Sequence, residues 1–365
     1  MFNKEIIDAY ADYYLTKDKV HRLRFGQHRV PNSFDTYRSS TNRQELDRHE
    51  SIQSGAPGER DLGIAYYWSP KIAQERFAQL AAYHNGPGDY GVFGIMVYNG
   101  QGRNKSELNG DKHIGVRLAY PFELPNGRLL ETGVMAFRGV YSVSGAGSPT
   151  STTSTALCRQ GLNRQGGCDT TDERITAYLW TPPQPWGLLA EGTIGKNAKR
   201  NETTNIIEEN PLIGGYVQGY YTWRYSDVGM LTPYVRYGEY YGGMKSLTGA
   251  PDGQLRSWNF GLVWVQSKGD GAPHYVAWTR RSADLWPDFA RSRQKGTWRN
   301  QQNWGRICSC SGVSWVQTVS FSGQAGKPFC PGVPLKAEPA LMYYWSKDAV
   351  AVYDDNKRLV PWVEK

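Results

Sequence analysis

Apolar and polar residues alternate over much of the first 267 positions of this 365-residue chain. In one run, Leu62, Ile64, Tyr66 and Trp68 fall on the same face of an extended strand. A period of two residues is typical of a β-strand with one apolar face, so the pattern predicts an all-β, antiparallel protein. About 11 such runs are visible, at residues 5–15, 20–29, 61–68, 93–97, 113–122, 132–143, 175–179, 188–194, 217–225, 231–237 and 258–264.

Two parts of this region depart from the alternation. Within residues 69–85, apolar residues recur at helical spacing and predict a short helix. Residues 144–171 are rich in Ser, Thr and Gly and predict a long loop. Elsewhere short turns, as at 125–127, alternate with long polar loops, as at 195–214. Turns at one end and loops at the other are typical of outer-membrane barrels.

The polar faces of the predicted strands carry many basic residues. Solvent-facing strand positions of soluble proteins are usually Thr, Lys, Glu or Ser, so repeated arginines indicate faces that line a water-filled pore. For any single arginine the alternative is an ion pair with an acid across the lumen. The basic residues on these faces are Arg22, Arg24, His28, Arg117, Arg138, Arg174, Arg224 and Arg236.

The composition narrows the class of protein. No run of about 18 apolar residues occurs, which excludes a transmembrane helix. A membrane-spanning strand escapes that test, because only every second residue meets lipid. The 24 Tyr, 13 Trp and 41 Gly suit a barrel with aromatic girdles. They also suit a soluble β-sandwich that binds carbohydrate, which is the alternative fold and function and would turn its apolar faces inward.

Charge and motifs exclude several functions. The net charge is +8, but residues 268–365 hold 14 Lys and Arg against 8 Asp and Glu, a charge of +6. The remaining basic residues form no single stripe, so nucleic-acid binding is not indicated. No nucleophile elbow, zinc-protease motif or phosphate-binding loop occurs, and we therefore predict no enzyme, cofactor or metal. An outer-membrane hydrolase is a third hypothesis, since spacing alone does not rule out a Ser/His/Asn arrangement.

Residues 20–61 combine a strand that has a basic face with a long polar segment. Their run RFGQHRVPNSFDTYRSSTNRQELDR, with GDYGVFGI and the strand at 214–225, resembles the phosphate-selective porin O/P family of Gram-negative outer membranes. The resemblance extends over residues 5–265. It implies a trimeric transmembrane β-barrel of the 16-stranded type, which passes phosphate or polyphosphate through a basic lumen.

The resemblance also places an inward-folded loop at residues 35–61. Arginine suits such a place because its planar fork pairs with phosphate oxygens and stays charged. Arg38, Arg43, Arg48 and Arg60 are then the expected constriction. The other residues of the predicted anion pathway are Arg22, Arg24, Arg117 and Arg138. The implied partners are outer-membrane lipid, small anions such as phosphate, and two further copies of the chain.

The two ends of the chain differ from the strand-rich region. Residues 268–365 lack a sustained period, and we expect an irregular tail there. It is either a separate soluble domain or the product of a reading-frame shift near residue 267. The start, MFNKEIIDAY, lacks the basic and apolar regions of a signal peptide. Because an outer-membrane protein requires such a signal, we interpret the chain as a fragment whose barrel lacks strands at both ends.

Two of the five cysteines bracket a polar, glycine-rich loop. Cys158 and Cys168 could close this loop as a disulfide in an oxidising compartment. Two unpaired thiols are the alternative. Neither the spacing nor the surrounding residues indicate zinc.

Overall fold

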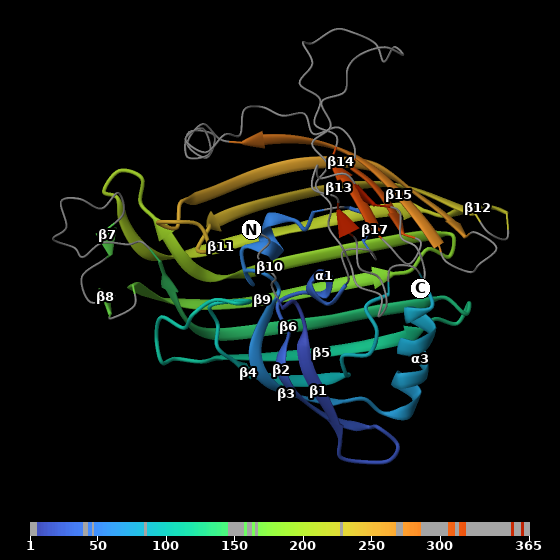
Figure 1. Ribbon diagram of the computed structural model, residues 1–365, viewed down its shortest axis with the longest axis horizontal. Coiled ribbons are helices and arrows are strands. Elements are labelled where there is room, and N and C mark those ends of the chain that lie inside the picture. The colour runs from blue at the N-terminus through green and yellow to red at the C-terminus, as the bar shows by residue number, and fades with distance from the viewer. Residues whose placement is uncertain are drawn as a thin grey trace, which may run out of the picture.

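The protein is built around one large, curved β-sheet (Figure 1). The computed structural model describes residues 6–38, 43–45, 47–83, 86–144, 157–158, 163–164, 167–226, 229–267, 273–285, 306–310, 314–318, 352–353 and 359–360. The main strands, which we call the wall, are β1 (Ala9–Tyr14), β2 (His21–Arg29), β3 (Arg60–Trp68), β4 (Phe93–Tyr98), β5 (His113–Glu123), β6 (Leu129–Val143), β9 (Gly167–Thr181), β10 (Trp186–Arg200), β11 (Ile206–Tyr221), β13 (Gly229–Gly243), β14 (Asp252–Ser267) and β15 (Pro273–Leu285).

The remaining elements are short. Three helices are α1 (Phe34–Tyr37), α2 (Glu50–Gln53) and α3 (Lys71–Ala81). The helix α3 confirms the helix predicted within residues 69–85. The minor strands are β7 (Leu157–Cys158), β8 (Asn163–Arg164), β12 (Trp223–Ser226), β16 (Arg306–Cys310), β17 (Ser314–Thr318), β18 (Val352–Tyr353) and β19 (Leu359–Val360). No helix among the described residues is long and apolar enough to cross a bilayer.

Each wall strand pairs antiparallel with its predecessor in the wall, in the order β1 to β6, then β9, β10, β11, β13, β14 and β15. This order confirms the predicted all-β antiparallel fold, and β1 to β14 correspond to the expected strands. The long polar loop expected at residues 195–214 was wrong, because β10 extends to Arg200 and β11 begins at Ile206. Between β1 and β15 the described residues form an open sheet rather than a closed barrel. A single sheet of this kind is not a sandwich.

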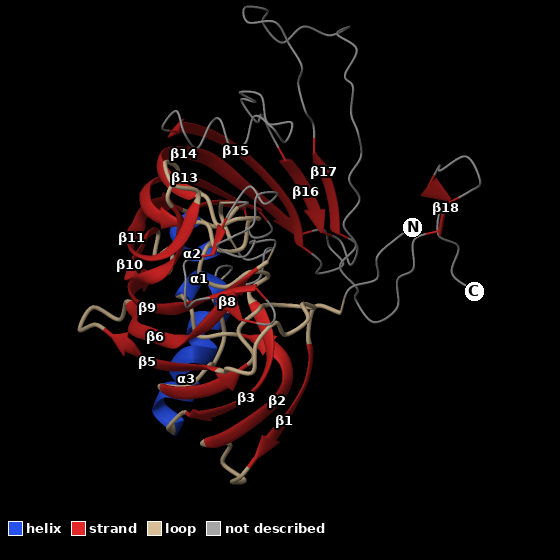
Figure 2. Ribbon diagram, turned by 90° about the vertical axis from the view of Figure 1, so that its left-hand side faces the viewer, coloured by secondary structure: helices blue, strands red, loops and turns tan. Residues whose placement is uncertain are grey.

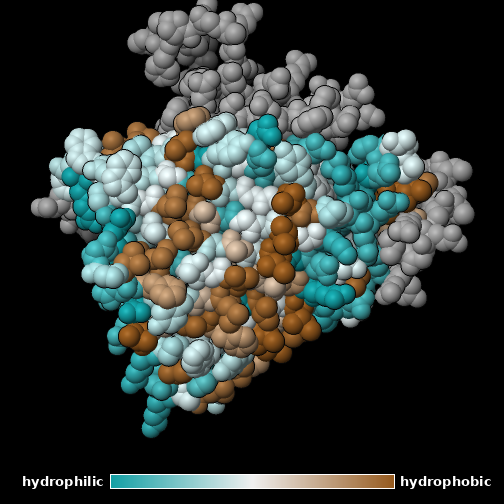
Figure 3. Space-filling model, turned by 180° about the vertical axis from the view of Figure 1, so that it is seen from behind, coloured by the Kyte–Doolittle hydropathy of each residue, from teal (hydrophilic) through white to brown (hydrophobic). Residues whose placement is uncertain are grey.

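The two faces of the wall differ in polarity. Large apolar side chains cover the convex side, and Figure 3 shows them as a broad band across the molecule. Ile64, Ile194 and Ile213 are each more than half exposed there. The arginines that alternate with such residues, Arg24 and Arg174, are buried on the concave side. The apolar faces thus point away from the interior, as the barrel hypothesis requires and as a sandwich does not allow.

The strand β6 is an exception to the predicted orientation. Met135 and Phe137 point inward and are buried, whereas Arg138 lies on the outer face with 78% of its side chain exposed. There it pairs with Glu173 at 3.5 Å. The placement of Arg138 in the anion pathway was therefore wrong. On the inner face of β6, Met135 packs into a buried apolar cluster. The apolar residues of this strand therefore did not show which of its two faces meets lipid. Arg224, in the short strand β12, is also exposed.

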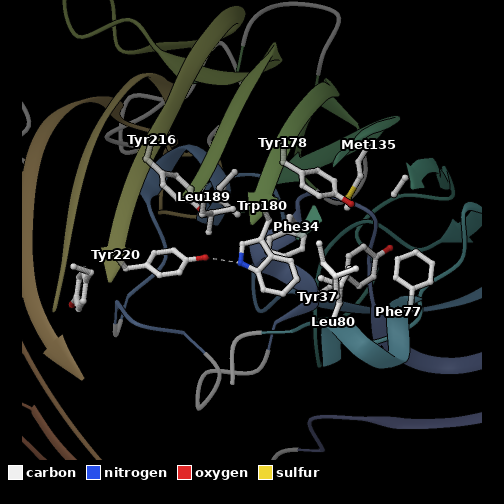
Figure 4. Packing of buried hydrophobic residues seen from close by; sticks show 14 of the residues in the cluster. Phe34, Tyr37, Phe77, Leu80, Met135, Tyr178, Trp180, Leu189, Tyr216 and Tyr220 are labelled. Atoms are coloured by element: carbon white, nitrogen blue, oxygen red, sulfur yellow. Dashed lines mark hydrogen bonds between the residues drawn. The ribbon is translucent and has the colours of Figure 1, made fainter. Parts of the chain in front are cut away.

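Helices lie on the concave side of the wall (Figure 2). Buried side chains form an apolar cluster there. Phe34 of α1 lies 4.8 Å from Tyr178 and 5.1 Å from Trp180, measured between ring centroids. The indole of Trp180 donates to the Tyr220 hydroxyl at 2.8 Å, as the dashed line in Figure 4 marks. Phe77 of α3 belongs to the same buried cluster. The ring contacts of Phe34 pack α1 against the inner face of β9, and α3 packs against β5.

Residues beyond 267 and the predicted long loop are described in part. The strand β15 pairs with β14 from Leu255–Leu285 to Ser267–Pro273, although residues after 267 were expected to be irregular. Most of the predicted tail lies outside the described residues, as does most of the loop at 144–171. Within that loop, Cys158 and Cys168 form a disulfide with an S–S distance of 2.11 Å. This resolves the alternative between a disulfide and free thiols.

The exposed apolar band predicts that a charge placed on it will destabilise the protein in a bilayer. Ile194→Lys, near the middle of β10, should reduce the unfolding free energy by about 2–4 kcal/mol. Urea unfolding in phospholipid vesicles measures this change. Lys196→Ile, two residues along the same face, is the matched control and should not destabilise. A loss below about 0.5 kcal/mol for Ile194→Lys, typical of a position in water, would contradict a lipid-facing band.

Candidate functional site

The described residues between positions 30 and 59, which we call the inserted segment, lie on the concave side of the wall (Figure 2). It connects β2 to β3 and contains α1 and α2. Both helices begin at a side-chain cap. Ser33 Oγ accepts a hydrogen bond from Thr36 N at 3.0 Å, and His49 Nδ1 accepts one from Ser51 N at 3.3 Å. Such caps satisfy donors that have no partner within the helix.

Cationic side chains of the wall and its loops bind the backbone of the inserted segment. Arg174 of β9 donates to Ser51 O at 2.9 Å. Arg236 of β13 donates to Asp47 O at 2.9 Å. Lys245, which follows β13, donates to Gly55 O at 2.8 Å, and burial lowers the pKa of Lys245 to about 8. Three carbonyl groups of the segment are therefore held by cations from distant parts of the chain.

An acidic side chain of the wall holds the other end of the segment. Glu191 Oε1, on the inner face of β10, accepts hydrogen bonds from Phe34 N at 2.6 Å and Asp35 N at 3.3 Å. Its second oxygen accepts one from the Tyr216 hydroxyl at 2.7 Å. These bonds satisfy the first backbone donors of α1. Glu191 thus positions Asp35 and the residues that follow it.

A glycine in the wall allows the segment to approach closely. A Cβ atom at Gly238 of β13 would lie 2.4 Å from His49 Nε2, nearer than any real Cβ contact. His49 caps α2 and lies 5.7 Å from Tyr216, measured between ring centroids. A larger residue at this position would therefore displace the His49 ring from its place beside the wall.

Three predicted constriction arginines surround one carboxylate. Asp35 lies 3.5 Å from Arg38, 3.9 Å from Arg43 and 3.9 Å from Arg48, measured between nitrogen and carboxylate oxygen. Only 3% of the Asp35 side chain is exposed. Burial alone would raise the pKa of Asp35, but the guanidinium groups outweigh it and hold the pKa below its usual value. We call these four residues the arginine cluster.

Further hydrogen bonds and ion pairs fix the arginine cluster. Arg48 donates from Nε to Asp35 O and from Nη2 to Arg38 O, both at 3.0 Å. It also pairs with Glu59. Arg60, the fourth predicted constriction residue, lies 2.6 Å from Glu59 and 3.0 Å from Asp8. Glu59 therefore links Arg60 to Arg48, and through Arg48 to the rest of the arginine cluster.

Three of the other predicted pathway residues, Arg22, Arg24 and Arg117, lie on the inner face of the wall, apart from the arginine cluster, whereas Arg138 lies on the outer face. Arg24 makes two hydrogen bonds to Asp12 at 2.6 and 2.7 Å. Arg117 pairs with Glu131 at 2.7 Å. Arg22 donates to the carbonyl of Asp89 at 2.8 Å. Each of these arginines therefore has a partner inside the wall. For Arg24 and Arg117 that partner is an acid, as in the alternative interpretation of a single arginine as one half of an ion pair.

Sequence reasoning missed several residues of the site. Arg174 and Arg236 were assigned to polar strand faces but not to the predicted pathway. Glu191 occupies an inward position of an alternating run, so the same pattern could have identified it. Lys245 lies in a polar loop, and no local signal marks it. Within the described part of the chain, no group of three or more His, Cys, Asp or Glu could hold a metal ion.

A curved antiparallel sheet with an apolar outer face and a charged, segment-filled inner face defines an outer-membrane porin. Residues 2–267 match the family model of phosphate-selective porin O and P, and the chain belongs to this family. Its place is accordingly the bacterial outer membrane.

Other comparisons give partial matches. The chain is 56% identical over 34 residues to one of the opine oxidase subunits of Rhizobium meliloti and to its counterpart in Agrobacterium tumefaciens (strain Ach5). Each match spans 9% of this chain and 9% of the relative. Among solved structures, OmpF of Salmonella typhi in complex with daunomycin matches at 17% identity over 74% of this chain and 69% of that chain, with a TM-score of 0.43. OmpT of Vibrio cholerae matches at 10% identity over 73% and 68%, with a TM-score of 0.40.

The hydrogen bonds of Glu191 predict that its loss will release the inserted segment. Glu191→Ala leaves two backbone donors and one hydroxyl without their acceptor, each costing about 1–3 kcal/mol when buried. Trypsin should then cut after Arg38, Arg43 or Arg48 faster than in the parent protein. Glu239→Ala, on the outer face of β13, is the control. Equal cleavage rates in the Glu191 variant and the parent would show that these bonds do not hold the segment.

Proposed function

We propose that this porin passes small anions, with phosphate or polyphosphate as the preferred substrate class. The observation that carries the proposal is the arginine cluster, in which three guanidinium groups of the inserted segment gather around one carboxylate. A carboxylate and a phosphate offer similar oxygens to a guanidinium group. A site that accepts the first has donors suited to the second.

Electrostatics support the proposal. Rings of basic residues are a common source of anion selectivity in pores, where fixed charges replace part of the hydration shell of the ion. Arginine keeps its charge at any growth pH. Conduction also requires weak binding, so that ions leave as readily as they enter. The ion pairs of Arg24, Arg60 and Arg117 moderate the field along the wall and thereby favour several shallow sites over one deep site.

We also propose that the porin contacts outer-membrane lipid, assembles as a homotrimer and catalyses no reaction. The apolar band is suited to outer-membrane lipid, because a spanning strand must turn apolar side chains outward. Assembly as a homotrimer follows from the family resemblance and stays a proposal. We assign no enzymatic step, since the groups of the arginine cluster attract and orient anions and need no chemical change to do so.

Reversal potentials across a planar bilayer test the proposed selectivity. The refolded chain should prefer chloride and phosphate over potassium. Arg43→Gln removes one guanidinium group from the cluster and should lower the anion-to-cation permeability ratio by roughly a factor of two or more. Arg138→Gln removes the same charge from the outer face and should leave the ratio unchanged. A potassium-preferring current in the parent protein would refute the proposal.

A further inference from the structure

The outer face of the wall carries a groove that runs over β9, β10, β11 and β13. The groove has a volume of about 620 Å³. Two glycines form its floor, because Gly192 of β10 lies opposite Gly215 of β11 in the register of the sheet. The side chains along it are apolar or aromatic, and the outward-facing ones are Leu179, Ile213, Val217, Tyr237 and Tyr241. The groove is therefore a hollow within the apolar band.

The floor of the groove is open because no side chain fills it. A Cβ atom added at Gly192 would have no described atom within 4 Å, apart from its neighbours along the chain. The volume lies in the range of about 300–1,000 Å³ that is typical of pockets for small organic ligands. A flexible apolar chain lying in the groove has contacts on several sides, whereas a chain lying on the flat part of the band has them on one.

One edge of the groove is polar. Glu239 lies there and accepts hydrogen bonds from the hydroxyl groups of Tyr237 and Tyr241. Arg256 Nε donates to the same carboxylate at 2.9 Å. The side chains of Arg256 and Glu239 are 56% and 31% exposed, so both face outward. The groove is thus flanked by an accessible pair of opposite charges.

A second hollow, of about 180 Å³, adjoins the groove on the side of the strand ends. The two hollows share Ile213 and Tyr241. The second is also lined by Lys199, near the end of β10, and by Asp252, at the start of β14, which pair at 2.9 Å. The surface therefore changes from apolar near the middle of the strands to charged near their ends. A membrane lipid changes in the same order, from its chains in the middle of the bilayer to its head at the surface.

We propose that the outer groove binds a phospholipid, with an acyl chain lying over Gly192 and a zwitterionic head at the polar end. Lys199 and Arg256 are the partners for its phosphate. Asp252 and Glu239 are the partners for its ammonium group. Each of the two ion pairs is neutral overall, so a head with one charge of each sign complements them better than a purely anionic head.

A second copy of the chain is the alternative occupant of the groove. Continuity with the apolar band favours lipid, because Ile194 and Val217 beside the groove are each more than half exposed on the face that meets the bilayer. The order of polarity along the groove also follows that of a lipid, which a protein partner does not require. The inference rests on the proposed contact with lipid. It is independent of the proposed anion selectivity, because the groove and the arginine cluster lie on opposite faces of the wall.

Gly192→Leu tests the inference because its side chain fills the groove. Native mass spectrometry of the full chain, refolded in detergent with phosphatidylethanolamine, measures the fraction that retains a lipid. We expect this fraction to fall about fivefold or more, since many small dispersion contacts are lost together. Gly219→Leu is the matched control. Gly219 lies on the outer face of β11 and also has open space around its Cα, but it does not line the groove, so its variant should retain lipid as the parent does.

A second lipid tests the polar end of the site. Phosphatidylglycerol, which has a phosphate but no ammonium group, should be retained less than phosphatidylethanolamine by the parent protein. Equal retention of the two lipids would overturn the assignment of a zwitterionic head.

Two other outcomes would overturn the groove as a lipid site. One is an equal fraction of bound lipid in Gly192→Leu, Gly219→Leu and the parent. The other is a loss of oligomers in Gly192→Leu without a loss of lipid, which would assign the groove to a second copy. Resistance of the inserted segment to trypsin verifies that each variant is folded. The anion preference of the parent in planar bilayers is a separate measurement, so failure of this inference is distinguishable from failure of the proposed selectivity.

Discussion

The interior depends on cationic side chains that bind carbonyl oxygens of an inserted segment. Arg174, Arg236 and Lys245 each donate to a backbone carbonyl of residues 30–59. Bonds from a charged donor are stronger than those between neutral groups, and they matter most where water is excluded. Because of these bonds, a segment whose described helices, α1 and α2, are one turn each can keep a fixed position against the wall. Its arginines are then presented at defined distances from one another.

This arrangement divides the basic residues of the inner face between two roles. Some bind the segment and fix its position, as Arg174 does. Others belong to the segment and form the arginine cluster around Asp35. A buried guanidinium group is costly unless it is paired, which explains why nearly every inner arginine lies near a carboxylate or a carbonyl. The positive charge of the interior is therefore greatest where several arginines lie near one carboxylate, as at Asp35, and smaller where each arginine has its own acid.

The sequence was sufficient to predict the wall but not the contacts inside it. Alternation identified the outward position of Ile194 and the inward position of Arg117, because each strand must present one face to lipid. It failed at Arg138, where an apolar inner cluster reverses the usual polarity of the strand. The grouping of three arginines around Asp35 required the fold of residues 30–59, and Lys245 was beyond prediction because its partner Gly55 is 190 positions away.

The separation along the chain between the inserted segment and its binding partners has a consequence for assembly. Residues 30–59 leave the ribosome early, yet Glu191, Arg236 and Lys245 belong to strands and loops made much later. Contacts between such distant positions form slowly, since a long loop must close before any bond repays its lost entropy. We therefore expect the segment to dock late, after the hairpins of β9 to β13 have formed, so that the sheet assembles before its interior is filled.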